Sequence, residues 1–188
     1  MNLNKSETYT REGDAGSTKL GCGRPEMKDA LRLECIGTIE EASRFIGLAA
    51  ADLKTDILYQ VQNDLQDAIT ELSYFTAGNA PVRLDYQRIK DLEAWIDIHD
   101  HHMNPLEAPL LPGGTSTAGI LHIARNITRR AERRLVELAD EYDVSTAVMH
   151  YMNRVSDFLL VQARIANLAG VEDVHWEPGR VRNAKDDE

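Results

Sequence analysis

The feature that most constrains this chain is the spacing of its apolar residues, which recur at intervals of three and four. The spacing occurs in residues 28–53, 56–75, 85–100, 116–142 and 145–169, and no stretch shows the sustained alternation that marks a strand. Such intervals place the apolar side chains on one face of an amphipathic helix. Long helices joined by short connections are typical of a bundle, so the sequence predicts an all-α, five-helix antiparallel bundle.

The connections and ends divide the chain into three parts. Its 188 residues, 43% of them hydrophobic, suit one domain with one core. We expect an N-terminal segment over residues 1–27, a helical bundle domain over residues 28–176 and a mobile tail over residues 177–188. Thr55 is the expected N-cap of the second helix, and Gly170 is expected to stop the last one.

The charge balance narrows the class of partner. The chain has 31 acidic and 21 basic residues and a formal net charge of -10, which argues against a nucleic acid or an anionic membrane surface. Nowhere do about 18 apolar residues run together, so no membrane span is expected. Cys22 and Cys35 lack the spacing of a zinc site or a disulfide framework, which indicates a reducing, cytoplasmic location.

The segment before the first helix combines glycines with hydroxyl and basic side chains. Four glycines between residues 10 and 28 are interleaved with threonine, serine, arginine and lysine. Such a backbone can approach an anion closely and offer it amide and hydroxyl donors. The spacing of a Walker P-loop is absent. Two interpretations therefore stay open, an anion-binding segment and a flexible leader.

The fourth predicted helix carries a dense arginine cluster. Its members are Arg125, Arg129, Arg130, Arg133 and Arg134. Arg125, Arg129 and Glu132 share one face, which continues an apolar stripe. A solvated arginine and glutamate face is one interpretation. The other is a face that meets carboxylates or phosphates, because a buried charge needs a partner.

Other polar residues are candidate ligands. Asn153 and Asp157 of the fifth helix lie four residues apart and can face one cleft. A histidine and aspartate cluster at the end of the third helix suggests a metal site, but a solvated cluster is favoured there. Its members are Asp97, His99, Asp100, His101 and His102. His122 and His150 are expected to pack or hydrogen-bond, and Met149, Met152 and Phe158 are expected in the core.

Five short motifs occur in a defined order along the chain. They read TREGDAGSTKL at 10–20, GTIEEAS at 37–43, LPGG at 111–114, ARNITRRAER at 124–133 and NRVSD at 153–157. Gly23, Arg24, Lys28 and Asp29 extend the first motif. Together these motifs resemble those of the PduO-type ATP:cob(I)alamin (corrinoid) adenosyltransferases.

The resemblance implies a homotrimer that binds ATP between neighbouring subunits and moves its 5′-deoxyadenosyl group to the reduced cobalt of cobalamin, releasing triphosphate. Mg²⁺ would be carried with ATP and have no firm protein ligand. The N-terminal residues expected at the nucleotide are Thr10, Arg11, Gly13, Asp14, Gly16, Ser17, Thr18 and Lys28. The helical residues expected there are Arg129, Glu132, Arg133 and Asn153. The implied catalytic group is Arg125, Glu40 and Arg129.

The chain departs from the family pattern mainly on the corrinoid side, where the expected residues are Pro109, Ser43 and Asp157. Pro109 stands where the family has an aromatic residue that helps displace the lower axial ligand of cobalt. Glu40 replaces an aspartate that pairs with the arginine matching Arg125. A non-catalytic ATP- or corrinoid-binding paralogue is therefore the alternative to an enzyme, and an inert helical scaffold is a third hypothesis. A reductase or an adenosylcobalamin-dependent acceptor enzyme is the protein partner that the resemblance suggests.

Overall fold

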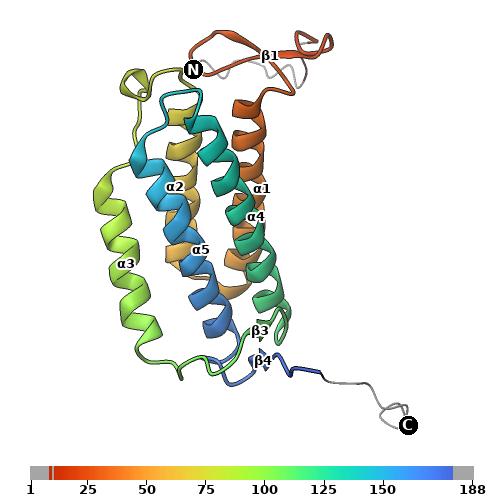
Figure 1. Cartoon of the computed structure of the whole chain (residues 1–188), viewed down its shortest axis with the longest axis vertical. Coiled ribbons are helices and arrows are strands. Elements are labelled where there is room, and N and C mark those ends of the chain that lie inside the picture. The colour runs from red at the N-terminus through yellow and green to blue at the C-terminus, as the bar shows by residue number, and fades with distance from the viewer. Residues whose placement is uncertain (1–8, 10, 180–188) are drawn as a thin grey trace.

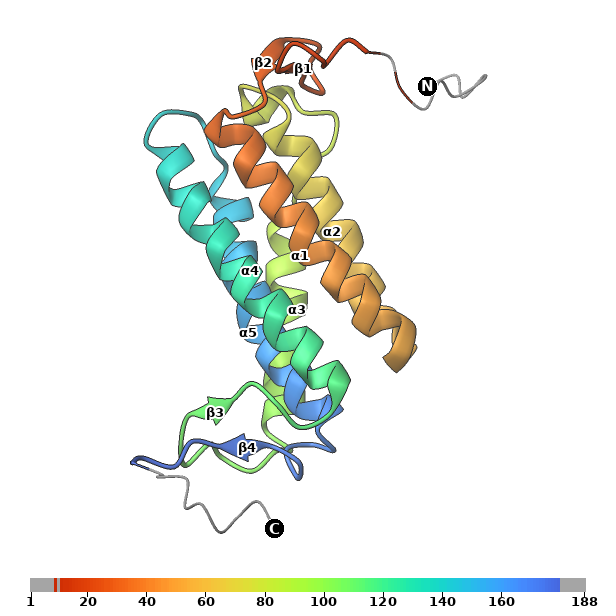
Figure 2. The ribbon, with the colours of Figure 1, turned by 90° about the vertical axis from the view of Figure 1, so that its right-hand side faces the viewer.

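Five long helices dominate the structure, a computed structural model that describes residues 9 and 11–179 (Figure 1). They are α1 (Leu31–Leu53), α2 (Asp56–Leu72), α3 (Tyr86–Asp100), α4 (Ser116–Ala139) and α5 (Thr146–Ala166). Consecutive helices run in opposite directions, α1 packs on α2 and α4, and α5 packs on α3 and α4 (Figures 1 and 2). The predicted all-α bundle is confirmed. None of the helices in the described part of the chain is long and apolar enough to cross a membrane.

The core explains why these segments are helical. Each helix turns its residues at intervals of three and four inward, so that large side chains such as Ile39, Leu65, Leu121 and Phe158 are fully buried. Met152 also lies in this core, as predicted. Met149 does not, because it is only partly buried and lines a surface pocket beside α4.

Several helix ends differ from the prediction. α5 ends at Ala166, three residues early, because Leu168 and Ala169 have φ values of 53° and 56° and Gly170 has 89°. Left-handed residues cannot continue a right-handed helix, so the chain turns away before Gly170. Thr55 occupies the N-cap of α2, but its side chain makes no capping hydrogen bond.

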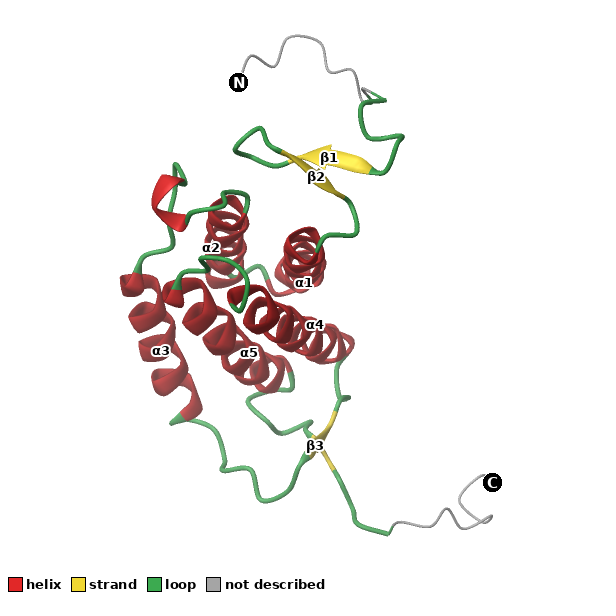
Figure 3. Cartoon of the chain, turned by 45° about the horizontal axis from the view of Figure 1, so that its top comes forward, coloured by secondary structure: helices red, strands yellow, loops and turns green. Residues whose placement is uncertain are grey.

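Short strands that the sequence does not predict close both ends of the bundle (Figure 3). β1 (Ser17–Lys19) pairs antiparallel with β2 (Pro25–Met27) above α1. β3 (Leu110–Leu111) pairs antiparallel with β4 (Val174–His175) at the opposite end. A single-turn 3-10 helix, η1, spans Ala77–Asn79. Strands of two or three residues are too short to show an alternating pattern. The tail predicted to be mobile lies outside the described residues from residue 180 onward.

Buried polar groups hold the end that carries β3 and β4. Arg164 donates from Nε to Asp173 at 2.8 Å and from Nη2 to the carbonyl of Asn104 at 2.6 Å. Asn167 accepts from the amide of Thr115 at 2.9 Å and donates to the carbonyl of Gly113 at 3.1 Å. A Cβ on Gly114 would lie 2.3 Å from Oδ1 of Asn167, so only glycine fits there. The LPGG motif therefore docks the loop before α4 onto the end of α5.

Candidate active site

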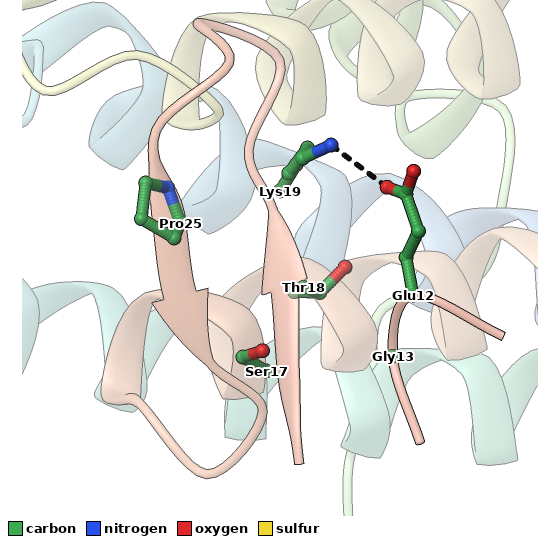
Figure 4. Close-up of a pocket in the computed structure, with 6 residues that line it drawn as sticks. All are labelled: Glu12, Gly13, Ser17, Thr18, Lys19 and Pro25. Carbon is green, nitrogen blue, oxygen red and sulfur yellow. Dashed lines mark hydrogen bonds and ion pairs between the residues drawn. The ribbon is translucent and has the colours of Figure 1, made fainter. Parts of the chain in front are cut away.

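The β1–β2 hairpin forms a polar pocket at one end of the bundle (Figure 4). Its volume is about 250 Å³, and it is lined by Glu12, Gly13, Ser17, Thr18, Lys19 and Pro25. Lys19 donates to Glu12 across 2.7 Å on one side, and the hydroxyls of Ser17 and Thr18 lie beside the pocket. The segment predicted to bind an anion is thus folded into a hairpin with hydroxyl groups on one strand.

Lys28 reaches back to the glycines of this hairpin. A Cβ on Gly13 would lie 3.0 Å from Nζ of Lys28 and 3.2 Å from the carbonyl oxygen of Ser17. The amide of Lys28 donates to the carbonyl of Gly16 at 2.9 Å, and Gly16 has a φ of 86° that favours glycine. Glycine at position 13 therefore lets an ammonium group approach the backbone closely. Arg11 and Asp14 are close to Gly13 in the sequence, and both residues are exposed. Thr10 lies outside the described residues.

A second pocket lies between α4 and α5. It has a volume of about 200 Å³ and is lined by Glu132, Val136, Met149, His150, Asn153 and Arg154. Asn153 donates to Glu132 at 2.8 Å, which joins the two helices. Arg154 donates from Nη1 to the side-chain oxygens of Asn153 and Asp157, each at 2.9 Å. Its Nε donates to Glu93 of α3 at 2.7 Å.

Arg154 is a residue whose role the sequence analysis missed. Its three acceptors lie on two helices, α3 and α5. Through these hydrogen bonds Arg154 holds the side chains of Asn153 and Asp157 in place. Its neighbours raise the pKa of its guanidinium, the hydrogen bond to Glu93 most of all. The NRVSD motif contains Arg154, but only the folded structure shows that Glu93 lies opposite.

The arginines of α4 have different surroundings. Arg130 forms an ion pair with Glu41 of α1, and Arg134 pairs with Glu137 at 3.0 Å. Arg133 donates to the backbone carbonyl of Arg129 at 3.1 Å. Within residues 11–179, the guanidinium of Arg129 has no ion pair or hydrogen-bonded partner. Arg129 and Arg130 are both exposed, as the predicted solvated face requires, but Arg129 differs from Arg130 and Arg134 in having no carboxylate partner among the described residues.

Arg125 is the most unusual arginine of the cluster. Its Nε is buried and has no hydrogen-bond partner within the described residues. Burial lowers the pKa of this guanidinium and so does the charge of Arg129, while the carboxylate of Asp157 acts in the opposite direction. An unpaired buried donor beside a second cation is unfavourable unless an anion binds there. The arrangement can therefore hold phosphate or carboxylate.

The family-derived pair between Glu40 and Arg125 is not formed within the described chain. Glu40 instead accepts from Arg44 at 3.3 Å, one turn along α1. Ser43 accepts from Nε2 of Gln62 at 2.8 Å through its carbonyl and at 3.4 Å through its hydroxyl. Both residues lie on α1, and Ser43 serves there to join α1 to α2.

Pro109 lies at the end of the bundle away from the hairpin, immediately before β3 (Figure 2). Its carbonyl accepts from the amide of Trp176 at 2.8 Å. The side chains of both residues are exposed. The backbone of an aromatic residue, Trp176, thus pairs with Pro109, the position at which the family pattern has an aromatic residue. The sequence offers no signal for this neighbour, because 67 residues separate the two positions (176 − 109).

The histidine cluster at the end of α3 is arranged by ring contacts. His99 stacks on Trp95 with ring centroids 3.8 Å apart, and His101 contacts His102 edge to face. Across residues 11–179, no three or more His, Cys, Asp or Glu side chains are grouped as a metal site would require. His122 is buried in α4, and the exposed His150 packs edge-on against Tyr86.

Comparison with known proteins gives consistent matches. Residues 8–166 match the sequence profile of a family described as cobalamin adenosyltransferase. The corrinoid adenosyltransferase of Bacillus subtilis (strain 168) is 40% identical over 178 residues, which cover 90% of this chain and 91% of that protein. The corrinoid adenosyltransferase PduO of Salmonella typhimurium is 40% identical over 83% of this chain and 48% of that protein.

A solved structure matches the fold as well. It is a variant PduO-type ATP:corrinoid adenosyltransferase from Lactobacillus reuteri, complexed with cobalamin and ATP. The TM-score is 0.82 and the identity 29%, and the match covers 91% of this chain and 99% of the other.

Proposed function

The chain belongs to the cobalamin adenosyltransferase family, and on that premise we propose that it transfers the 5′-deoxyadenosyl group of ATP to the reduced cobalt of cobalamin or a related corrinoid. The electron pair of Co(I) forms the new cobalt–carbon bond at C5′ of the ribose. The C5′–oxygen bond breaks, and its electrons leave with triphosphate. Because the cobalt is itself the nucleophile, the protein needs to position the substrates and stabilise the leaving charge.

The triphosphate fits the hairpin pocket. Lys28 brings an ammonium group against Gly13, and Ser17 and Thr18 offer hydroxyl donors at the same pocket. Gly16 adds a backbone turn that only glycine adopts easily. We assign Thr10, Arg11 and Asp14 to the same segment on the basis of the motif. Mg²⁺ carried with ATP would neutralise part of the phosphate charge, and no protein ligand is assigned to it.

The helices supply the remaining nucleotide contacts in this proposal. The guanidinium of Arg129 has no partner within residues 11–179, and Asn153 and Glu132 are hydrogen-bonded to each other at one pocket. Arg133 lies one turn beyond Arg129 on α4. Arg125 and Arg129 stabilise the charge that develops on the leaving triphosphate, and Glu40 orients an arginine of this group.

We further propose a homotrimer in which each nucleotide lies between neighbouring subunits. In one chain, the hairpin pocket and the α4–α5 pocket have entirely different lining residues. A neighbouring copy can bring a hairpin to the arginine face, which would otherwise keep uncompensated charge. Sedimentation velocity tests the proposed oligomeric state and should show a trimer. A stable monomer that binds ATP with full affinity would contradict the proposal.

The corrinoid side is proposed at the family-derived positions Pro109, Ser43 and Asp157. Pro109 lies at the end of the bundle away from the hairpin, and Ser43 and Asp157 lie near the middle of α1 and α5. A cytoplasmic location agrees with two free cysteines, Cys22 and Cys35. A reductase or an acceptor enzyme for the product would be the protein partner.

The single observation that carries the function is the buried Nε of Arg125, which has no hydrogen-bond partner in the described part of the chain and lies near Arg129 in a protein of net charge -10. The test is an anaerobic assay with MgATP and chemically reduced cobalamin, which follows adenosylcobalamin by absorbance and triphosphate by chromatography. Product in stoichiometric amounts supports the enzyme. ATP binding without product supports the non-catalytic paralogue, which Pro109 and the engagement of Ser43 with Gln62 favour.

A further inference from the structure

Two arginines and two aromatic residues meet where the hairpin touches the bundle. Cζ of Arg24 and Cζ of Arg32 each lie 5.0 Å from the ring centroid of Phe75. Cζ of Arg32 also lies 4.7 Å from the ring of Tyr142. We call Arg24, Phe75, Arg32 and Tyr142 the arginine–aromatic stack. It joins the hairpin turn, the end of α2, the start of α1 and the loop after α4.

Arg32 shows that the stack is a built feature of the fold. The residue is 2% exposed, and its Nη1 donates to the carbonyls of Leu72 at 2.7 Å and Tyr74 at 3.1 Å. Its Nε and Nη2 are buried without hydrogen-bond partners among the described residues. The faces of Phe75 and Tyr142 therefore provide the electrostatic compensation for this buried cation.

The hairpin depends on the bundle for its position. Its two strands have three residues each, and a hairpin of this size is at best marginally stable in isolation. Leu20 is buried, and a Cβ on Gly21 would lie 3.0 Å from Cβ of Ser73. The amide of Cys22 donates to the carbonyl of Ser73 at 3.4 Å. Arg24 adds the contact with Phe75, so the turn docks on the residues that follow α2.

This docking is connected directly to the proposed phosphate pocket. Arg24 immediately precedes β2, whose Pro25 and Glu26 pair with Lys19 and Thr18. A shift at Arg24 therefore moves β2 and, through this pairing, β1, whose Ser17 and Thr18 carry the hydroxyls of the pocket. Phe75 itself is not among the residues that line that pocket.

We propose that Phe75 is a positioning residue for the nucleotide-binding segment, which it holds on the bundle through its contacts with Arg24 and Arg32. The proposal rests on the proposed function for its effect on ATP, but the anchoring can be measured without ligand. Phe75 acts through the hairpin and does not touch the triphosphate. It therefore affects the apparent affinity for ATP more than the rate of the bound complex.

The first test uses Phe75→Leu in the full chain, which keeps apolar volume and removes the ring. Loss of a cation–π contact predicts a KM for ATP that is higher by about fivefold. We expect the kcat to change by less than about twofold, because the reacting groups are untouched. Amide hydrogen exchange of residues 17–27 should become faster in the absence of ATP. Phe75→Tyr keeps the ring and should retain the wild-type KM and exchange rates.

Matched variants separate anchoring from general loss of stability. Tyr59→Leu removes an exposed aromatic ring from α2, the helix that precedes Phe75, and should leave the KM for ATP unchanged. Arg24→Gln changes an exposed residue of the hairpin turn, so the packing of the core is unaffected and the variant should fold. It should reproduce the higher KM for ATP. If both residues act through one contact, the double variant should be no worse than the more affected single variant.

The proposal is overturned if Phe75→Leu and Arg24→Gln leave both the KM for ATP and the exchange of residues 17–27 at wild-type values. It is also overturned if Phe75→Tyr behaves like Phe75→Leu. Absence of adenosyl transfer by the wild-type protein would reject the proposed function instead. Hydrogen exchange without ligand would still decide whether Phe75 anchors the hairpin.

Discussion

The bundle carries a short antiparallel strand pair at each end, and the two pairs differ in how they are assembled and in what they expose. β1 and β2 are separated by one turn and form a hairpin lined with polar groups. β3 and β4 come from distant parts of the chain, and around them Leu111, Val174 and Trp176 are 45%, 42% and 48% exposed. The hairpin end therefore suits a polar anionic ligand, and the opposite end presents apolar side chains to solvent.

The two ends are also held by different interactions. At the hairpin end, the Lys19–Glu12 ion pair is exposed, and the buried cation Arg32 faces aromatic rings. At the opposite end, Arg164 and Asp173 form a buried ion pair with side chains that are 5% and 1% exposed. Buried pairs depend strongly on both partners, whereas exposed pairs contribute little. The end with distant strands is thus the one fixed by a buried charge pair.

The largest effect is expected at the β3–β4 end. Asp173→Ala leaves Arg164 buried without its main partner, which should lower the free energy of unfolding by about 3 kcal/mol. Urea denaturation followed by circular dichroism measures this change. Lys19→Ala is the matched variant at the hairpin end and should have no measurable effect on stability. Equal effects of the two variants would remove the distinction between the ends.

The next effect concerns the nucleotide half of the proposed site. Arg129→Ala removes charge-assisted hydrogen bonds to phosphate, so the Kd for MgATP should rise by about ten- to a hundredfold. The fold should persist, because the guanidinium of Arg129 has no partner within residues 11–179. Calorimetric titration provides the measurement, and exposed Arg83→Ala is the control. Unchanged affinity would remove Arg129 from the nucleotide site.

A smaller effect is expected on the corrinoid half. Pro109 offers no aromatic wall, so the protein should use cobinamide, which has no lower nucleotide base, better than cobalamin supplied as Co(II) with a reductase. Pro109→Phe should narrow this preference severalfold. Its backbone carbonyl is already held by the amide of Trp176, which helps the position to tolerate the change.

The preference is measured as the ratio of kcat/KM for cobinamide to kcat/KM for cobalamin, in the wild type and in Pro109→Phe. Pro81→Phe is the control, because Pro81 is an exposed proline in the connection after α2. Paramagnetic resonance of the Co(II) form then shows whether the four-coordinate species increases in Pro109→Phe. An abundant four-coordinate species in the wild type would assign the displacement to another residue, and Trp176 is the neighbour to test.

The same contrast explains what the sequence could predict. Helical periodicity is a local property, so the five helices follow from the spacing of residues such as Ile39 and Leu121. The hairpin pocket also follows in part, because its glycines, hydroxyls and Lys28 are close in sequence. Arg125 and Arg129 were predicted as a cationic face because they lie one turn apart.

Contacts between distant segments could not be predicted in this way. Nothing local indicates that Trp176 lies beside Pro109, or that Asn167 requires glycine at position 114. The pair of Glu40 with Arg125 that the family pattern suggests is not formed within the described chain, where Glu40 accepts from Arg44, one turn away on the same helix. Arg154 and Phe75 were missed because their partners, Glu93 and Arg24, lie on other elements.

The smallest predicted effect concerns His122, a buried residue of α4 that interacts electrostatically with Arg125 of the arginine cluster and with Asp173 at the β3–β4 end. Burial lowers the pKa of this imidazole, the charge of Arg125 lowers it further, and the carboxylate of Asp173 acts in the opposite direction. The unfolded chain, with a pKa near 6.5, therefore binds a proton more readily than the folded protein. Stability from this group is fully present above pH 6.5 and is lost as the pH falls through the folded-state pKa. The measurement is urea denaturation between pH 7.5 and pH 5. We expect the free energy of unfolding of His122→Gln to depend less steeply on pH than that of the wild type. The control is the exposed His150→Gln, which should keep the wild-type slope. Identical slopes for all three proteins would show that the proton on His122 does not couple the arginine cluster to the β3–β4 end.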